Sequence, residues 1–356
     1  MIEMNTTIGS ANGAGQATLI KPVIEYLGTD KPVNRTKPLV SVCITAYQHA
    51  KYIEQCLSGA IAQNADFPYE VLVGEDDSND GTREICKQFA EKYPDKIRLF
   101  LHERANNYLI AGEPSGQNNF VNNLREARGE FLAFCDGDDF WTQPDKIQRQ
   151  VKAMADAPQS LICFHKVDSI HDTTGAHEYM GDFGSEKIYV SAEQIVMMCG
   201  SAMPLNSIML KEEVVPYLMQ PGYEASHFLI QALGGALSPK GAVYLPEVMS
   251  CYRKHSSSSI TQRSINTSNA KPVWTSMRLR MLDMVGGLAV MDLAEAIGAT
   301  KRLMVLHAIS SGYLSVNDTI SYCRQVGVSP KELTFWASMG KSMAKRTIRM
   351  VAKKRK

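Results

Sequence analysis

The sequence predicts an α/β fold in which a mostly parallel sheet is flanked by helices and followed by a helical accessory region. Short runs rich in Val, Ile and Leu alternate with helically periodic segments between residues 38 and 136. Two of these runs end in clusters of acidic residues, and the pattern becomes Met-rich and helical after Thr261. Such an alternation is typical of parallel sheets covered by helices. We therefore expect a flexible leader over 1–37, an α/β domain over 38–261 and a helical region with a basic tail over 262–356.

The alternation predicts individual elements in order. Strands are indicated by short β-branched runs, and helices by apolar residues that recur every three or four positions. In the first half we expect strands over 39–45, 69–73, 97–101 and 130–135, with helices over 51–63, 82–93 and around 120–127. In the more irregular middle part we expect short strands at 161–167, 207–210 and 242–245 and a helix near 227–233. Further helices are expected near 273–297, 300–312, 317–326 and 331–351.

The composition is that of a soluble globular protein, with 44% hydrophobic and 21% charged residues among 356 and a net charge of +1. This balance gives no overall bias toward nucleic acid or toward acidic partners. The eight cysteines are scattered without a C-x-x-C pair, as expected of reduced core thiols in a cytoplasmic protein. No run of about 18 apolar residues occurs, so we expect neither a membrane span nor export.

Two acidic clusters each follow a predicted strand. The first reads EDDSNDGT at 75–82, and the second reads DGDD at 136–139. Helix capping by Ser78, Asn79 or Asp80 would account for one acid of the first cluster, and solvation alone could explain either cluster by itself. Because the carboxyl ends of parallel strands meet at one edge of a sheet, we expect both clusters to converge on one crevice. Such repelling carboxylates are tolerated beside a divalent cation, which would also bind the diphosphate of a nucleotide.

Four segments, taken in order, resemble glycosyltransferase family 2, whose members have the GT-A fold. They read VSVCITAYQH at 40–49, EDDSNDGT at 75–82, DGDDFW at 136–141 and LPEVMSCYRKH at 245–255. The resemblance covers about residues 38–260. It implies a metal-dependent transferase, using Mn²⁺ or Mg²⁺, that moves a sugar with inversion from a nucleotide-sugar to a hydroxyl of a glycan or lipid-linked glycan. UDP is the donor nucleotide we expect, from its frequency in the family.

The same resemblance implies donor-binding roles for eight residues. They are Thr45 and Tyr47 at the border of the base pocket, Asp76 at the base, Asp136 at the ribose, Asp138 and Asp139 at the metal and diphosphate, and Arg253 and His255 at the diphosphate from the opposite side. The chemistry of arginine independently supports the role of Arg253 at the diphosphate, because a guanidinium can bind phosphate in a bidentate way. An ordinary basic loop is the alternative reading of residues 252–255.

The segment GYEASHFL at 222–229 departs from the family pattern. Inverting members usually place an acidic base here, whereas this chain has His227 in its place and Glu224 three residues earlier. Either side chain could take the proton of a sugar hydroxyl, and we favour Glu224 as the carboxylate. His227 could also be a cap or core residue, and the missing Asp leaves open a catalytically silent nucleotide-sugar-binding protein. A nucleotidyltransferase is less favoured, because no Gly-rich, Lys/Arg-bearing triphosphate loop follows the first predicted strand.

The C-terminal tail over 341–356 carries eight basic residues and no acidic residue. Together with scattered apolar side chains it could form an amphipathic helix on an anionic membrane surface, or it could be a solvated tail. A nucleic-acid partner is less supported, because no reading motif accompanies the basic residues. We therefore expect a cytoplasmic protein, and the two alternatives for the tail leave open whether it is peripheral at the inner face of the membrane.

Overall fold

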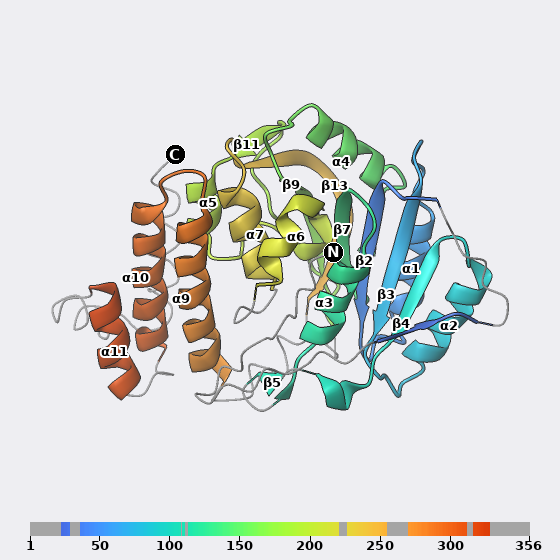
Figure 1. Cartoon of the computed structure of the whole chain (residues 1–356), viewed down its shortest axis with the longest axis horizontal. Helices are drawn as coiled ribbons and strands as arrows, with labels where there is room; N and C mark the ends of the chain where they lie inside the picture. The colour runs from blue at the N-terminus through green and yellow to red at the C-terminus, as the bar shows by residue number, and fades with distance from the viewer. Residues whose placement is uncertain are drawn as a thin grey trace, which may run out of the picture.

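The computed structural model describes residues 23–28, 36–107, 109–110, 113–220, 226–254, 270–311 and 316–327. Within them a large sheet carries helices on both faces, and the C-terminal helices stand at the end of the molecule remote from the first helices (Figure 1). The predicted leader up to residue 22 and the basic tail lie outside the described residues.

The main sheet has eleven strands, nine of them in the order β1-β4-β3-β2-β7-β12-β9-β13-β11. Four neighbouring strands, β4-β3-β2-β7, are parallel, as are β9 and β13, while the other pairs are antiparallel. This mixed sheet, parallel at its centre, confirms the predicted fold class. The strands of this path are β1 (Ile24–Tyr26), β2 (Val40–Ala46), β3 (Tyr69–Glu75), β4 (Ile97–Leu101), β7 (Phe131–Asp136), β9 (Ile162–His171), β11 (Ile188–Val190), β12 (Met209–Lys211) and β13 (Ala242–Lys254).

Four short strands complete the β structure. β8 (Phe140–Trp141) pairs with β13, β10 (His177–Met180) pairs with β9, and β5 (Leu109–Ile110) pairs with β6 (Glu113–Pro114) in a separate ribbon. The strand β13 runs nine residues past its predicted end at 245. Its register with β9 shifts twice, between Leu245 and Val248 and between Val248 and Cys251, so the period-two alternation that marks a strand is interrupted. This extension brings Arg253 into the sheet.

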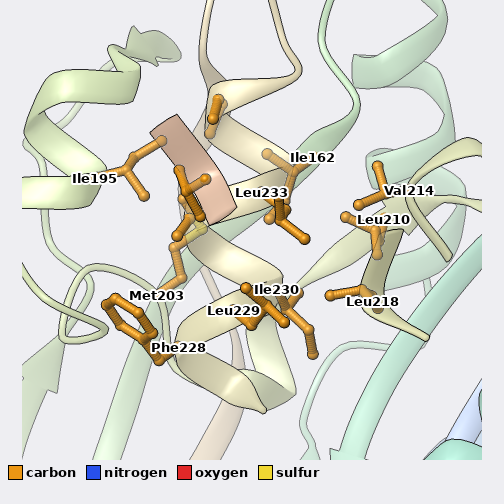
Figure 2. Packing of buried hydrophobic residues seen from close by; sticks show 14 of the residues in the cluster. Ile162, Ile195, Met203, Leu210, Val214, Leu218, Phe228, Leu229, Ile230 and Leu233 are labelled. Atoms are coloured by element: carbon orange, nitrogen blue, oxygen red, sulfur yellow. The ribbon is translucent and has the colours of Figure 1, made fainter. Parts of the chain in front are cut away.

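Helices cover the two faces of the sheet in separate sets. Buried residues of α1 (Ile53–Ile61), α2 (Thr82–Lys92) and α4 (Lys146–Ala155) form one core with the strands. The other core contains residues of α3 (Gln117–Glu126), α5 (Ala192–Met197), α6 (Val215–Leu218) and α7 (His227–Ala236). In Figure 2, Leu229, Ile230 and Leu233 of α7 lie among Ile162, Ile195 and Leu210 from three other elements. Such burial of branched apolar side chains is the main favourable term in folding.

The C-terminal helices are α9 (Ala270–Leu288), α10 (Ala294–Ser310) and α11 (Val316–Val326). α9 contributes Met277, Met281 and Val285 to the same core as α7, so this helical region packs directly on the α/β part. The helices predicted near 273–297 and 300–312 correspond to α9 and α10, but the boundary between them differs, because α9 ends at Leu288, just after a pair of glycines with weak helix propensity, and α10 begins at Ala294. None of the helices in the described ranges is long and apolar enough to cross a membrane. The helix predicted at 331–351 lies outside them.

Candidate active site

The ends of the parallel strands β2, β3 and β7 bring the two acidic clusters together. Thr45 lies opposite Gly74 on one side and Asp136 on the other. Its hydroxyl donates a hydrogen bond of 2.6 Å to Oδ1 of Asp136, and its carbonyl accepts one of 2.8 Å from the backbone N–H of Gly137. The N–H of Asp76 in turn donates to the carbonyl of Ala46 at 2.9 Å. The two clusters therefore share one edge of the sheet, where the sequence placed them.

Asp76 is buried at this edge beside a guanidinium and close to an aromatic ring. Its Oδ1 accepts a hydrogen bond of 2.6 Å from Asn107, and its Oδ2 forms an ion pair with Arg104. The Arg104 guanidinium lies 3.6 Å from the centre of the Tyr47 ring and donates to the carbonyl of Pro114 at 2.9 Å. Burial raises the pKa of the Asp76 carboxyl to about 6, although Asn107 and Arg104 oppose the shift. An aromatic ring, a guanidinium, an amide and a carboxylate therefore lie together here, and these are the types of side chain that can recognise a nucleobase.

Sequence reasoning missed Arg104 and Asn107. Both lie in and beside a single turn of 3₁₀ helix (Arg104–Asn106) after β4, in a segment without periodicity or motif. Their position at Asp76 depends on how this segment folds back over the end of β3. A single Arg or Asn in an irregular loop carries no signal by which sequence alone could select it.

Other acids of the first cluster hold the loop in shape. Glu75 is fully buried, accepts the N–H of Ser78 at 2.8 Å and forms an ion pair with Arg83. Asp80 accepts the N–H of Thr82 at 3.0 Å at the start of α2, and its other oxygen accepts the N–H of Ala50 at the same distance. The loop acids thus stabilise the loop itself, whereas the N-cap of α2 is Gly81 and not Ser78, Asn79 or Asp80 as predicted.

Asp139 in the second cluster is occupied by protein donors. Its Oδ1 accepts a hydrogen bond of 2.8 Å from the N–H of Arg253, and its Oδ2 accepts one of 3.1 Å from Asn206. The side chain is almost fully buried, and this burial, with the nearby Asp138 charge, raises its pKa well above the ordinary value. Asp139 therefore ties the turn after β7 to β13, and its role as a metal ligand stays a prediction.

Asp136 and Asp138 fit a divalent cation better. The pKa of Asp136 is raised to about 6, first by burial and then by the charge of Asp138, so the two carboxylates repel each other. A cation bound beside them would relieve this repulsion. Oδ1 of Asp138 also lies 3.9 Å from Nε2 of His49. No group of three or more His, Cys, Asp or Glu side chains has the geometry of a metal site in the described part of the chain, so ligand oxygens would have to complete the coordination.

Strand β13 forms the opposite wall through Tyr252 and Arg253. Burial and the charges of Asp139, Asp136 and Asp138 raise the pKa of the Tyr252 phenol, which places its hydroxyl near the cluster. The Arg253 side chain forms a hydrogen bond with Gln55 of α1. Tyr252 was missed as a site residue, although it lies inside the matched motif. His255 lies outside the described residues.

Of the two residues predicted as the catalytic base, the structure describes only His227. Glu224 lies outside the described residues. His227 is the first residue of α7, and its Nε2 contacts the carbonyl of Met203 and lies 2.7 Å from Nε2 of Gln231. Burial lowers the pKa of His227 to about 4, so the imidazole is neutral near pH 7. The identity of the base stays a prediction.

Comparisons with known proteins agree with the resemblance. Residues 41–212 match the family model described as Glycosyl transferase family 2. A 221-residue stretch is 32% identical to an uncharacterized protein of Mycobacterium tuberculosis strain H37Rv, covering 61% of this chain and 59% of that relative's length. Glycosyltransferase AglE of Haloferax volcanii is 37% identical over 106 residues, or 29% of this chain and 31% of AglE.

Solved structures confirm the fold. The crystal structure of S. aureus TarS 1–349 in complex with UDP-GlcNAc has a TM-score of 0.58 and 17% identity, and the match covers 88% of this chain and 91% of that one. The same protein in complex with UDP gives a TM-score of 0.55. Residues 41–212 of this chain therefore match glycosyltransferase family 2, and the fold is GT-A.

Proposed function

We propose that this chain transfers a sugar, with inversion, from a UDP-sugar to a hydroxyl of a glycan or lipid-linked glycan. The observation that carries the proposal is the convergence of Thr45, Asp76 and Asp136 at one edge of the sheet, opposite Arg253. Family membership supports the reaction class. The TarS complex with UDP-GlcNAc supports UDP as the donor nucleotide, because a chain of the same fold binds it.

The donor would lie across the carboxyl ends of β2, β3 and β7. The base would stack near Tyr47 and hydrogen-bond with Asp76, Arg104 and Asn107, which present both acceptors and donors. The ribose would lie near Asp136. Thr45 keeps that carboxylate in place by donating to one of its oxygens, which leaves the other oxygen for the ligand or the cation.

Asp138, with Asp136 beside it, would hold a divalent cation, Mn²⁺ or Mg²⁺, which supplies Lewis-acid stabilisation of the leaving diphosphate when bound. Arg253 would supply a second, fixed positive charge from the opposite wall. We propose these two acids as the metal-binding pair and Asp139 as the residue that anchors β13 to the turn. Turning Asp139 toward a metal would leave the backbone N–H of Arg253 in β13 and the buried amide of Asn206 without this acceptor.

An inverting transfer is a single displacement, so one group must take the acceptor proton as the anomeric carbon is attacked. Glu224 and His227 remain the proposed candidates, on the segment that leads into α7. The neutral His227 could accept a proton, but its Nε2 already contacts the carbonyl of Met203. The carboxylate of Glu224 therefore stays the favoured base.

The test is release of UDP from UDP-sugars with manganese or with EDTA, with and without an oligosaccharide acceptor. An active transferase shows metal-dependent UDP release that an acceptor stimulates. A silent nucleotide-sugar-binding protein would bind UDP-sugars in calorimetry without turnover. A nucleotidyltransferase would instead release pyrophosphate from a nucleoside triphosphate and a sugar phosphate. Either of these two outcomes would refute the proposed transfer.

The acceptor and the place of action are part of the same proposal. We propose a cytoplasmic enzyme whose basic tail over 341–356 holds it at an anionic membrane surface, where lipid-linked acceptors are found. The charge of the tail and its scattered apolar residues support this. A solvated tail is the alternative.

A further inference from the structure

We infer that Gln55 and the ring of Tyr52, both at the N-terminal part of α1, are positioning residues that orient the Arg253 guanidinium toward the donor diphosphate. This inference rests on the proposed function, because it assigns a task within the same site. It concerns two residues that neither the acidic clusters nor the family motifs select.

Arg253 is held by three separate elements. Its backbone N–H is fixed to Oδ1 of Asp139 at 2.8 Å, and one terminal nitrogen donates to the side-chain oxygen of Gln55. The guanidinium lies 5.0 Å from the centre of the Tyr52 ring and 4.6 Å from that of the Phe140 ring, within the range of cation–π attraction. α1, β8 and the turn between β7 and β8 therefore fix a residue whose long side chain would otherwise sample many rotamers.

One donor of this fixed side chain lacks a partner. Nε of Arg253 is buried and has no hydrogen-bond partner among the described residues. Leaving such a donor unpaired costs about 1–3 kcal/mol, more for a charged group, so buried donors nearly always have an acceptor. The fork of a guanidinium matches two phosphate oxygens, one at Nε and one at a terminal nitrogen. A phosphate oxygen of the donor is the acceptor that this geometry fits.

The hydroxyl end of Tyr52 is fixed by hydrogen bonds that involve Asp172 and Lys51. Its hydroxyl donates to Oδ2 of Asp172 at 2.7 Å, and the same oxygen accepts from Nζ of Lys51 at 3.1 Å. The N–H of Asp172 donates to the carbonyl of Lys254 at 3.0 Å, so the network returns to the residue after Arg253. The Tyr52 hydroxyl and Lys51 lower the pKa of Asp172, so this anchor stays ionised near neutral pH. The ring against Arg253 is thus held from both sides.

The test compares Gln55→Leu with the matched control Gln88→Leu, since Gln88 is likewise exposed but lies on α2 away from the site. Calorimetry in manganese measures the dissociation constants of UDP and UMP for each variant and for Arg253→Ala. If Gln55 orients Arg253 toward the terminal phosphate, Gln55→Leu raises the UDP constant about three- to tenfold, up to about 1.4 kcal/mol, and changes that of UMP much less. In the Arg253→Ala background the substitution should have no further effect.

Tyr52→Phe separates the ring from its hydroxyl. It keeps the cation–π face and loses only the bond to Asp172, so the UDP constant should rise less than with Gln55→Leu. The inference is overturned if Gln55→Leu leaves the ratio of UDP to UMP affinity unchanged, if Gln88→Leu changes that ratio equally, or if the Gln55 effect persists without Arg253. Failure of the wild-type protein to bind UDP at all would refute the proposed function instead.

Discussion

Removing the carboxylate of Asp139 should destabilise the fold, whereas removing that of Asp138 should abolish metal-dependent nucleotide binding with little effect on stability. Asp139→Ala leaves two buried donors, the N–H of Arg253 and the amide of Asn206, without their acceptor. Each unsatisfied donor costs about 1–3 kcal/mol, so the loss of unfolding free energy should be about 2–6 kcal/mol. Asp138→Asn removes a charge that repels Asp136, so stability should stay the same or rise slightly.

Urea unfolding followed by circular dichroism measures the first quantity, and calorimetry of UDP with manganese or EDTA measures the second. Asp138→Asn should weaken manganese-dependent UDP binding at least about tenfold, or about 1.4 kcal/mol. Asp139→Asn, which keeps the shape and one acceptor oxygen, should retain manganese dependence with reduced stability. The assignment is wrong if Asp139→Ala is as stable as the wild type, or if Asp139→Asn loses manganese dependence while Asp138→Asn keeps it.

Four further predictions test other parts of the proposal. Asp76→Ala should weaken UDP binding by about 1.5–3 kcal/mol in calorimetry while manganese affinity changes little, and an unaltered UDP constant would refute its base contact. The pKa of Asp136 is raised to about 6 in the folded protein. Its protonated carboxyl therefore contributes fully to stability below about pH 4, and this contribution is lost as the pH rises through 6. Asp136→Asn should remove that part of the pH dependence of thermal unfolding. Glu224→Gln should lower turnover about 10²–10⁴-fold and spare UDP affinity, with His227→Ala as the comparison; near-normal turnover in both would place the base elsewhere. Truncation after Gly340 should reduce sedimentation with anionic liposomes at low salt, and equal binding of both forms would leave the tail a solvated segment.

Local sequence patterns determined the first half of the fold well. β-branched runs predicted the boundaries of β2, β3, β4 and β7 to within two residues, because a buried strand is recognisable from its own run of apolar side chains. The rule that carboxyl ends of parallel strands share one edge then predicted that the two acidic clusters, with Asp76 and Asp136, lie together. The family resemblance found in four segments is confirmed over residues 41–212.

Only the tertiary structure decided which protein groups surround each acid of the two clusters. The bond between Asp139 and Arg253 joins residues 114 positions apart, that between Asp76 and Arg104 spans 28, and that between Gln55 and Arg253 spans 198. These contacts depend on bulges in β13 and on a loop folded over β3, neither of which leaves a periodic trace in the sequence. A motif therefore predicts that a carboxylate lies at a strand end. Whether that carboxylate is available to a ligand or stabilises the fold depends on the hydrogen-bond donors that packing brings around it.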